Sequence, residues 1–383
     1  MKTHWRTYII PALLLVSCML LSACKSSAEQ RICFFGSSVC RGVGADSLNG
    51  YASLLTATLP AGWESVNISV DGNNTYDLFA RFDRDMTPIE AKYVVIGISL
   101  GNEGLHEKGA RATLSYKENM PRLIHMLQEQ GRVVIVTNNY PRADFNEVDY
   151  EDLCAVNLEV QQWNLPTINV FGTIDDGQGR WAEHMWNGSD IYHPNQLGHE
   201  AMASAFPPTM WEALQSGKPL PEYIPTQGDE NGVECVTFVP EGQVQSYTLS
   251  YMSTDTTFTE VYSAAQQKLW QYANGQLVAI TEGLGKTVGK ITIQGSNIHQ
   301  VLFYRAAMTP REVSALAKGK MLRSSLEIYC PLLGGETTNY AQTMNCVAIH
   351  NKYLIINQFK FNFYEKDLFS FLSDDSFCGC SCY

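Results

Sequence analysis

Basic charge is scarce in this sequence. Its 383 residues include 27 Lys and Arg against 39 Asp and Glu, which gives a formal net charge of −12. A protein that binds phosphate backbones needs a surplus of Lys and Arg, so this balance argues against nucleic acid as a partner. The same balance argues against electrostatic docking on anionic lipid, so any membrane association must come from another feature.

Long hydrophobic runs are lacking as well. Residues 9–21 are apolar but too few for a comfortable membrane span, and they follow Lys2 and Arg6. The run ends in Leu21-Ser22-Ala23-Cys24, which resembles the lipobox of bacterial lipoproteins. The resemblance implies cleavage before Cys24, lipidation of Cys24 and an exported protein of the bacterial envelope, with Lys25 favouring the outer membrane. A plain secretory signal with a coincidental cysteine is the alternative.

The cysteines do not form a regular framework. There are 11, and two of them (Cys18 and Cys24) lie in the signal region, which leaves an odd number. We interpret most of the others as buried thiols; these are Cys33, Cys40, Cys154, Cys235, Cys330 and Cys346. Cys378, Cys380 and Cys382 cluster at the C-terminus in a spacing that matches no zinc pattern, so we expect no metal and no cofactor.

A chain of this length predicts two domains. We expect a signal peptide over residues 1–23, a first domain over 24–218 and a proline- and glycine-rich linker over 219–232. A second domain then covers residues 233–347, and residues 348–383 form a tail of unknown role.

The first domain alternates short apolar runs with helical patterns. The expected strands are Ile32–Phe35, Ser65–Val70, Tyr93–Ser99, Arg132–Thr137 and Thr167–Ile174. The expected helices are Tyr51–Leu59, Ala110–Gln130, Tyr150–Trp163 and a final helix over Pro194–Gln215. This alternation is typical of an α/β fold in which helices cover both faces of a parallel sheet. Ligands then bind beyond the carboxyl ends of the strands.

The second domain is predicted to be all-β. The expected strands are Val233–Val239, Ser246–Met252, Lys268–Tyr272, Gln276–Ile280, Lys290–Ile293 and Leu326–Leu332. Asn274-Gly275 predicts a hairpin turn, and Thr309-Pro310-Arg311-Glu312 predicts a capped helix. The segment from Val301 through this capped helix resembles the laminin-G-like or concanavalin-type β sandwich, which implies a smaller sandwich-like domain. Trp270 and Tyr272 are either core aromatics or a platform for sugar.

Three residues of the first domain can activate a hydroxyl for attack on an ester. Ser38 follows the first strand in Phe34-Phe35-Gly36-Ser37-Ser38-Val39, while Asp190 and His193 lie in one short segment far downstream. A serine needs a base within hydrogen-bond reach, and the base needs a partner that fixes its tautomer. We therefore expect Ser38 as nucleophile, His193 as base and Asp190 as the group that orients it.

Attack on an ester carbonyl also needs donors for the oxyanion. The candidates are the backbone N–H groups of Ser38 and Gly72 and the side-chain amide of Asn102, each of which follows a predicted strand. Ser38, Gly72, Asn102 and His193, in this order, resemble the four signature residues of the SGNH (GDSL-type) hydrolases. The resemblance implies a three-layer, flavodoxin-like α/β/α domain that cleaves esters. Glu103 stands where the family usually has aspartate.

These features together predict an exported, lipid-anchored serine esterase that removes acyl groups, acetyl foremost, from carbohydrate. Arg142 is a candidate contact for a polar substrate. One alternative is a lipase or lysophospholipase with the same chemistry. The other is a non-catalytic, glycan-binding surface lipoprotein whose hydrolase domain is degenerate. The sequence does not indicate an oligomeric state.

Overall fold

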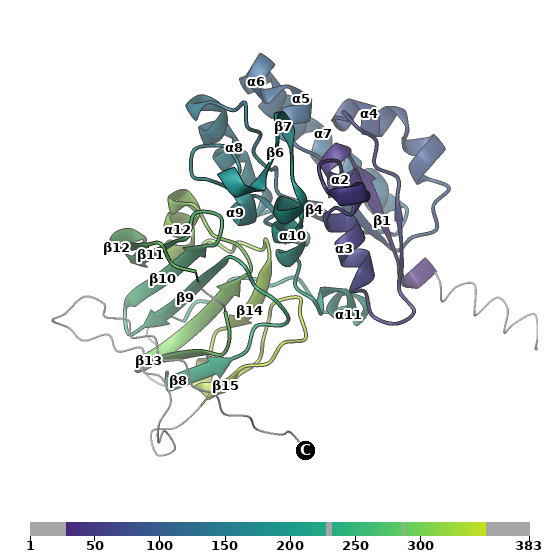
Figure 1. Cartoon of the computed structure of the whole chain (residues 1–383). Coiled ribbons are helices and arrows are strands. Elements are labelled where there is room, and N and C mark those ends of the chain that lie inside the picture. The colour runs from purple at the N-terminus through teal and green to yellow at the C-terminus, as the bar shows by residue number, and fades with distance from the viewer. Residues whose placement is uncertain (1–27, 227–231, 286–287, 350–383) are drawn as a thin grey trace, which may run out of the picture.

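The computed structural model describes residues 28–226, 232–285 and 288–349. The expected signal peptide, Cys24 and the C-terminal cysteine cluster lie outside these residues. Figure 1 shows an N-terminal domain of helices around a sheet, beside a C-terminal domain made mostly of strands. None of the described helices combines the length and the apolar character that a membrane-spanning helix requires.

The N-terminal domain is built on a five-stranded parallel sheet. Its strands are β1 (Arg31–Gly36), β2 (Glu64–Asn67), β3 (Tyr93–Gly97), β4 (Val133–Thr137) and β5 (Thr167–Ile168). They lie in the order β2-β1-β3-β4-β5, and each neighbouring pair is parallel. This is the flavodoxin-like order, in which the chain reverses direction across the sheet between β1 and β3. The predicted α/β class is confirmed.

Helices cover both faces of this sheet. The longer ones are α3 (Tyr51–Ala57), α4 (Thr75–Ala80), α7 (Ala110–Glu129), α8 (Glu147–Val160), α10 (Gln196–Ser204) and α11 (Met210–Gln215). One apolar core joins the sheet to residues of α4, α7 and α8, including Leu78, Leu123 and Leu153. A second core joins the other face to α3, α10 and α11, for example through Leu55 and Met202. The domain therefore has three layers.

Two element predictions for this domain are corrected. The apolar run Thr167–Ile174 is not one strand, because β5 ends at Ile168 and Phe171–Ile174 forms the short helix α9. Apolar residues in a short run fit a buried helix as well as a buried strand, so their pattern does not separate the two. The expected final helix is divided into α10 and α11, because Pro207 and Pro208 lie between them and interrupt helical hydrogen bonding.

The C-terminal domain is an antiparallel sheet of eight strands. The strands are β8 (Val233–Phe238), β9 (Tyr247–Ser253), β10 (Thr256–Ser263), β11 (Lys268–Ala273), β12 (Gln276–Glu282), β13 (Ile291–Tyr304), β14 (Leu326–Cys330) and β15 (Ala348–Ile349). The order is β12-β11-β10-β9-β13-β8-β15, with β14 paired to β13. The all-β class is confirmed, and the more specific laminin-G-like resemblance stays a prediction.

The long strand β13 connects the two halves of this sheet. Its first part pairs with β8 and its last part lies between β9 and β14, with register shifts around residues 294–300. The sequence predicted a strand over Lys290–Ile293, and the resemblance implied a second one from Val301, where the structure has the single strand β13; β10 was missed. The hairpin at Asn274-Gly275 joins β11 to β12, and both residues have positive φ. The helix α12 (Pro310–Ala317) begins with the predicted capping box, in which Thr309 accepts from the Glu312 N–H.

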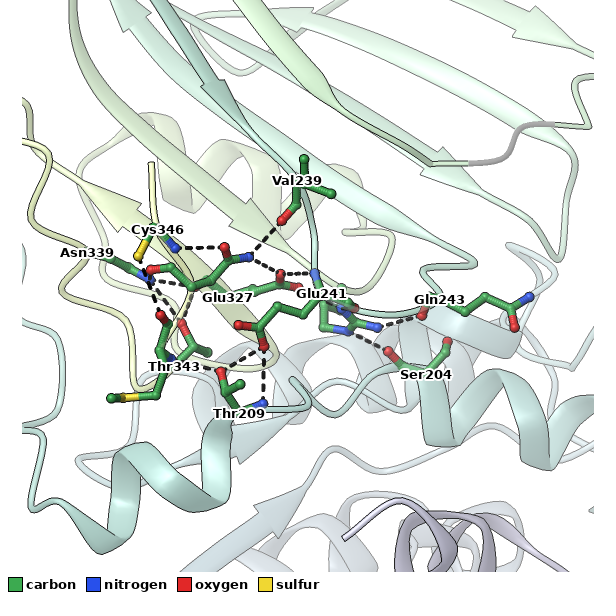
Figure 2. A network of polar contacts seen from close by, with 12 residues as sticks. Ser204, Thr209, Val239, Glu241, Gln243, Glu327, Asn339, Thr343 and Cys346 are labelled. Atoms are coloured by element: carbon green, nitrogen blue, oxygen red, sulfur yellow. Dashed lines mark hydrogen bonds and ion pairs between the residues drawn. The ribbon is translucent and has the colours of Figure 1, made fainter. Parts of the chain in front are cut away.

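A buried polar network joins the two domains (Figure 2). Arg305 is 2% exposed and pairs at 2.7 Å with Glu327, which is fully buried. Arg305 also donates to the carbonyl oxygens of Ser204, Glu241 and Gln243. Because Ser204 ends α10 of the N-terminal domain, the second domain is fixed to the helix that follows the His193 segment.

Candidate active site

Ser38 lies at the carboxyl end of β1, where the chain turns into the short helix α2 (Ser38–Arg41). The turn lies against β3, since the Ser37 N–H donates to the Gly97 carbonyl at 3.0 Å. A side chain at position 36 would collide with that same carbonyl oxygen, which explains the glycine. Gly36 therefore permits the close approach of β1 and β3 (Tyr93–Gly97).

His193 connects Ser38 to Asp190. Its Nε2 lies 2.9 Å from Ser38 Oγ, and its Nδ1 lies 2.8 Å from Asp190 Oδ2. In this arrangement Nδ1–H donates to the carboxylate, and Nε2 is free to accept the serine proton. The other carboxylate oxygen accepts from the backbone N–H groups of Tyr192 and His193. The structure thus brings together all three residues that the motifs predicted.

The hydrogen bonds around Asp190 control its charge. Partial burial alone would raise the pKa of its carboxyl group, but the Tyr192 and His193 donors outweigh burial and lower that pKa. The carboxylate therefore stays ionised at neutral pH, as the orienting role requires.

The local structure that holds His193 differs from expectation. Pro194 does not begin a helix; His193 lies in the strand β7 (Asp190–Pro194), which pairs with β6 (Trp186–Asn187). Helix α10 begins two residues after Pro194 and is capped by Asn195, whose side chain accepts from the Gly198 N–H. The Asn195 amide also donates to carbonyls of the β6 segment, so the hairpin and the helix are fixed to each other.

The expected oxyanion donors lie on loops at the same edge of the sheet as Ser38, where the Val70 N–H donates to the Gly36 carbonyl at 3.1 Å. Gly72 lies on the loop after β2 with φ of +74°, a conformation that favours glycine. Asn102 lies in the short helix α5 (Leu100–Glu103), and its Nδ2 donates to the Asn73 carbonyl at 3.0 Å. This bond leaves the second amide hydrogen of Asn102 available. Among the described residues, the N–H groups of Ser38 and Gly72 have no protein acceptor.

A buried arginine that sequence reasoning missed supports these loops. Arg81 is 5% exposed. It donates to Asn73 Oδ1 at 2.6 Å, to the Ile68 carbonyl at 2.7 Å and to the Gly36 carbonyl at 3.2 Å. One guanidinium thus connects β1, the end of β2 and the Gly72 loop. Arg81 closes the α4 helix far from any motif, and no sequence signal marked it.

Glu103 holds the same loop from the other side. Its carboxylate accepts from the Thr75 N–H at 2.7 Å, at the start of α4, and the side chain is 3% exposed. Burial raises the pKa of Glu103, although the Thr75 hydrogen bond opposes this. The unusual acid therefore connects the Asn102 helix to the Gly72 loop, and it does not face the substrate side.

The rim of the site is polar and aromatic. Tyr192, next to the catalytic histidine candidate, is 49% exposed and lies over the Arg142 guanidinium at 4.6 Å. Arg142 itself is buried and donates to the Gly101 carbonyl, so it supports the rim rather than reaching out to a substrate. Arg41 and Asp71 form an exposed ion pair across the other side, between α2 and the Gly72 loop.

A second histidine near the site has a structural position. His199 is fully buried, its Nδ1 accepts from the Tyr51 N–H and its Nε2 donates to the Val43 carbonyl. Burial lowers its pKa to about 4, so it is neutral at physiological pH. Among the residues that the structure describes, no cluster of His, Cys, Asp and Glu could hold a metal ion. Five of the six described cysteines are buried, and Cys346 is exposed, against expectation.

Comparison with known proteins agrees with this geometry. Residues 34–201 match the GDSL-like Lipase/Acylhydrolase family, and the match includes all five candidate site residues. No curated protein is similar enough in sequence to give a match.

Several solved structures resemble the N-terminal half. A lipolytic protein of the G-D-S-L family from Desulfitobacterium hafniense shares 16% identity, with 46% of this chain and 97% of that chain covered and a TM-score of 0.40. A catalytic mutant of an acetylxylan esterase from Geobacillus stearothermophilus shares 16%, with 46% and 91% covered and a TM-score of 0.39. An alpha/beta hydrolase from the metagenome of Lake Arreo shares 20%, with 49% and 95% covered and a TM-score of 0.37.

These TM-scores are low, so the assignment rests on the family match and on the fold described above. The family match stops at residue 201 and does not include the C-terminal sheet. The N-terminal domain is thus SGNH-like in fold, and its match to the GDSL-like Lipase/Acylhydrolase family supports a serine hydrolase that acts on ester bonds.

Proposed function

We propose that this protein is an exported serine esterase that removes acyl groups, acetyl foremost, from carbohydrate through a Ser38-His193-Asp190 triad. The observation that carries the proposal is the chain of hydrogen bonds from Ser38 Oγ through both His193 nitrogens to Asp190, at 2.9 and 2.8 Å. The family match supports ester hydrolysis. Export rests on the resemblance of Leu21-Ser22-Ala23-Cys24 to a lipobox, with Cys24 as the lipid anchor.

The proposed reaction has two halves. His193 Nε2 takes the Ser38 proton as Oγ bonds to the acyl carbon, and the resulting oxyanion accepts from the N–H groups of Ser38 and Gly72 and from the Asn102 amide. The C–O bond to the sugar then breaks, and His193 returns the proton to the leaving hydroxyl. Water repeats the sequence on the acyl-enzyme and releases the acid.

The surroundings of Ser38 favour a sugar over a lipid chain. The rim carries the exposed Arg41–Asp71 ion pair on one side and the exposed Tyr192 ring on the other. An aromatic face beside charged groups suits a hydroxyl-rich ring, whereas a long acyl chain requires a continuous apolar groove. A lipase or lysophospholipase remains the alternative within the same chemistry.

The reaction is tested with Ser38→Ala and p-nitrophenyl acetate. We expect turnover to fall by about 10⁴-fold or more with an unchanged melting temperature. Unchanged turnover would contradict the serine mechanism, and a wild-type protein without turnover would favour the non-catalytic, glycan-binding alternative. Acetate release from a panel of acetylated polysaccharides, compared with release of fatty acid from lysophospholipid, separates the two esterase candidates.

A further inference from the structure

A cavity of about 430 Å³ lies at the junction of the two domains, separate from the triad. The hydrolase domain contributes residues of α8 and α9 to its wall, and the C-terminal domain contributes residues of β11 and the segment before α12. In Figure 1, α9 lies beside α12 at this junction. The Ala307 N–H donates to the Gly172 carbonyl there, so the two walls are fixed relative to each other. The cavity therefore exists only in the two-domain protein.

Two aromatic residues from one strand form part of the wall. Trp270 and Tyr272 are alternate residues of β11, so they share the face of the sheet that is turned toward the hydrolase domain. Trp270 is only partly buried. The rings pack on the core of the domain and also border the cavity, so they are core aromatics whose exposed edges remain candidates for a sugar platform.

Groups that form hydrogen bonds surround these rings. Glu151 and Arg311 come from opposite domains and pair at 2.6 Å, yet both remain well exposed, so each keeps further hydrogen-bonding capacity. Gln266 and Asp175 also line the cavity. The Gln266 side-chain N–H donates to the Asp175 backbone carbonyl, and no other described residue donates to the Gln266 side-chain oxygen. The wall thus offers donors and acceptors next to aromatic faces, and its exposed charges are the paired Glu151 and Arg311.

We propose that this junction cavity is a second binding site that takes a neutral saccharide chain. The volume lies within the range of small-molecule sites, and domain junctions are a common location for them. A pyranose ring has an apolar face that packs on an aromatic ring, while its hydroxyls need donors and acceptors in the plane of the ring. The Glu151–Arg311 pair is balanced in charge and leaves no free cation among the described residues of the wall to attract an anionic ligand. The site deepens the proposed function, since it would hold a glycan on the enzyme that deacylates it.

One segment connects the cavity to the active site. Asp175 lines the cavity and bridges to Trp181, whose carbonyl accepts from Trp186 Nε1 at the start of β6. The β6–β7 hairpin then carries Asp190 and His193. A saccharide held at the junction is therefore bound by the segment that leads to the triad.

Calorimetry on the full chain tests the proposal. Ser38→Ala serves as the host, so that no substrate is consumed, and the probes are xylohexaose, mannohexaose and cellohexaose, with a galacturonic acid hexamer as the anionic control. We expect at least one neutral probe to bind and the anionic probe not to bind. Replacing Trp270 by Leu in this host should raise the Kd by about tenfold or more, because the stacking face of the indole is lost. Binding by none of the neutral probes, or equal binding after Trp270→Leu, would overturn the proposal.

Two further variants guard against a folding defect. Arg311→Ala changes an exposed side chain and should weaken binding by about threefold with an unchanged melting temperature, since exposed ion pairs contribute little stability. Tyr340→Ala removes an exposed tyrosine of the same domain outside the cavity and should leave binding unchanged. If p-nitrophenyl acetate is hydrolysed but no saccharide binds, the cavity proposal fails and the esterase stands. If saccharide binds but no acetate is released from any glycan, the cavity proposal stands and the proposed deacylation of carbohydrate fails.

Discussion

Two buried arginines organise two regions of this protein in different ways. Arg81, behind the active site, donates to loops whose other polar groups still include unpaired donors, namely the N–H groups of Ser38 and Gly72. Arg305, at the domain junction, pairs with Glu327, and both groups have all their side-chain polar atoms satisfied within the protein. The candidate active site thus keeps backbone donors available, whereas the Arg305–Glu327 pair of the junction leaves no side-chain polar atom without a partner.

In the candidate active site, Asp190→Asn should lower activity most. The amide cannot accept as a carboxylate does and would favour the wrong His193 tautomer, so kcat should fall by about 10⁴-fold. The folded-state pKa of Asp190 is lowered, so its ionised form adds stability at neutral pH that is lost as pH falls through that pKa. The loss of stability in Asp190→Asn, measured by urea unfolding, should therefore shrink in acid. An unchanged kcat would contradict the triad.

The junction should respond in stability rather than in chemistry. Arg305→Met leaves the Glu327 carboxylate buried and unpaired, which should lower the free energy of unfolding by about 3–5 kcal/mol. The double variant Arg305→Met with Glu327→Leu should recover much of that loss, because no charge is left buried. Chemical denaturation of both variants checks this, and equal losses in the two would contradict a cost that arises from the unpaired charge.

Asn102→Ala should lower kcat rather than stability, the opposite of the Arg305 variants, because Asn102 is a candidate oxyanion donor. Removing one oxyanion donor should reduce kcat by about 10²–10³-fold, with a small effect on KM. The melting temperature should change little, because the Asn102 side chain makes one hydrogen bond, to the Asn73 carbonyl, and is only partly buried. A higher KM with an unchanged kcat would assign Asn102 to substrate binding instead.

Asp175 predicts a pH-dependent stability at the junction. Burial raises its pKa from 3.8 to about 7, so the folded state keeps a proton that the unfolded chain releases. Its contribution is therefore complete below pH 4 and is lost as pH rises to about 7. Between pH 5 and pH 8 the wild type should lose about 2–3 kcal/mol more stability than Asp175→Asn. Parallel curves for the two proteins, measured by denaturant unfolding, would contradict this account.

Arg81 should give the smallest effect and the sharpest contrast with Arg305. Lysine retains the charge but cannot reach three carbonyl and amide oxygens at once, so Arg81→Lys should misplace the loops and lower kcat by about tenfold. KM should change little. Arg84→Lys is the matched control, since that neighbouring arginine is exposed and, among the described residues, pairs with Asp85 alone. A loss of stability without a change in kcat would make Arg81 a purely structural residue.

The three residues of the candidate triad could be identified from the sequence because local signals mark them. Ser38 directly follows an apolar strand, and Asp190 lies three residues before His193, so one hairpin delivers both. The parallel sheet was predictable for the same reason, because each buried strand is a short continuous run of apolar residues.

Features that depend on contacts between distant residues were not predictable. Arg81 contacts Gly36, which lies 45 positions earlier, and nothing in its own neighbourhood marks it as buried. Strand β10 has a polar sequence, Thr256-Thr257-Phe258-Thr259-Glu260, and is formed by its pairing with β9 and β11. The extent of β13 was hidden by Gly295-Ser296-Asn297, a break in the apolar pattern that the register shifts accommodate.

Covalent labelling of the nucleophile tests the central claim most directly. The full-length protein would be treated with a fluorophosphonate, digested and analysed by mass spectrometry. A serine that is hydrogen-bonded to His193 and faces an oxyanion site should react, so we expect one label, on Ser38, and none on the Asp190→Asn variant within the same time. Label on another residue, or no label on the native protein, would contradict the account.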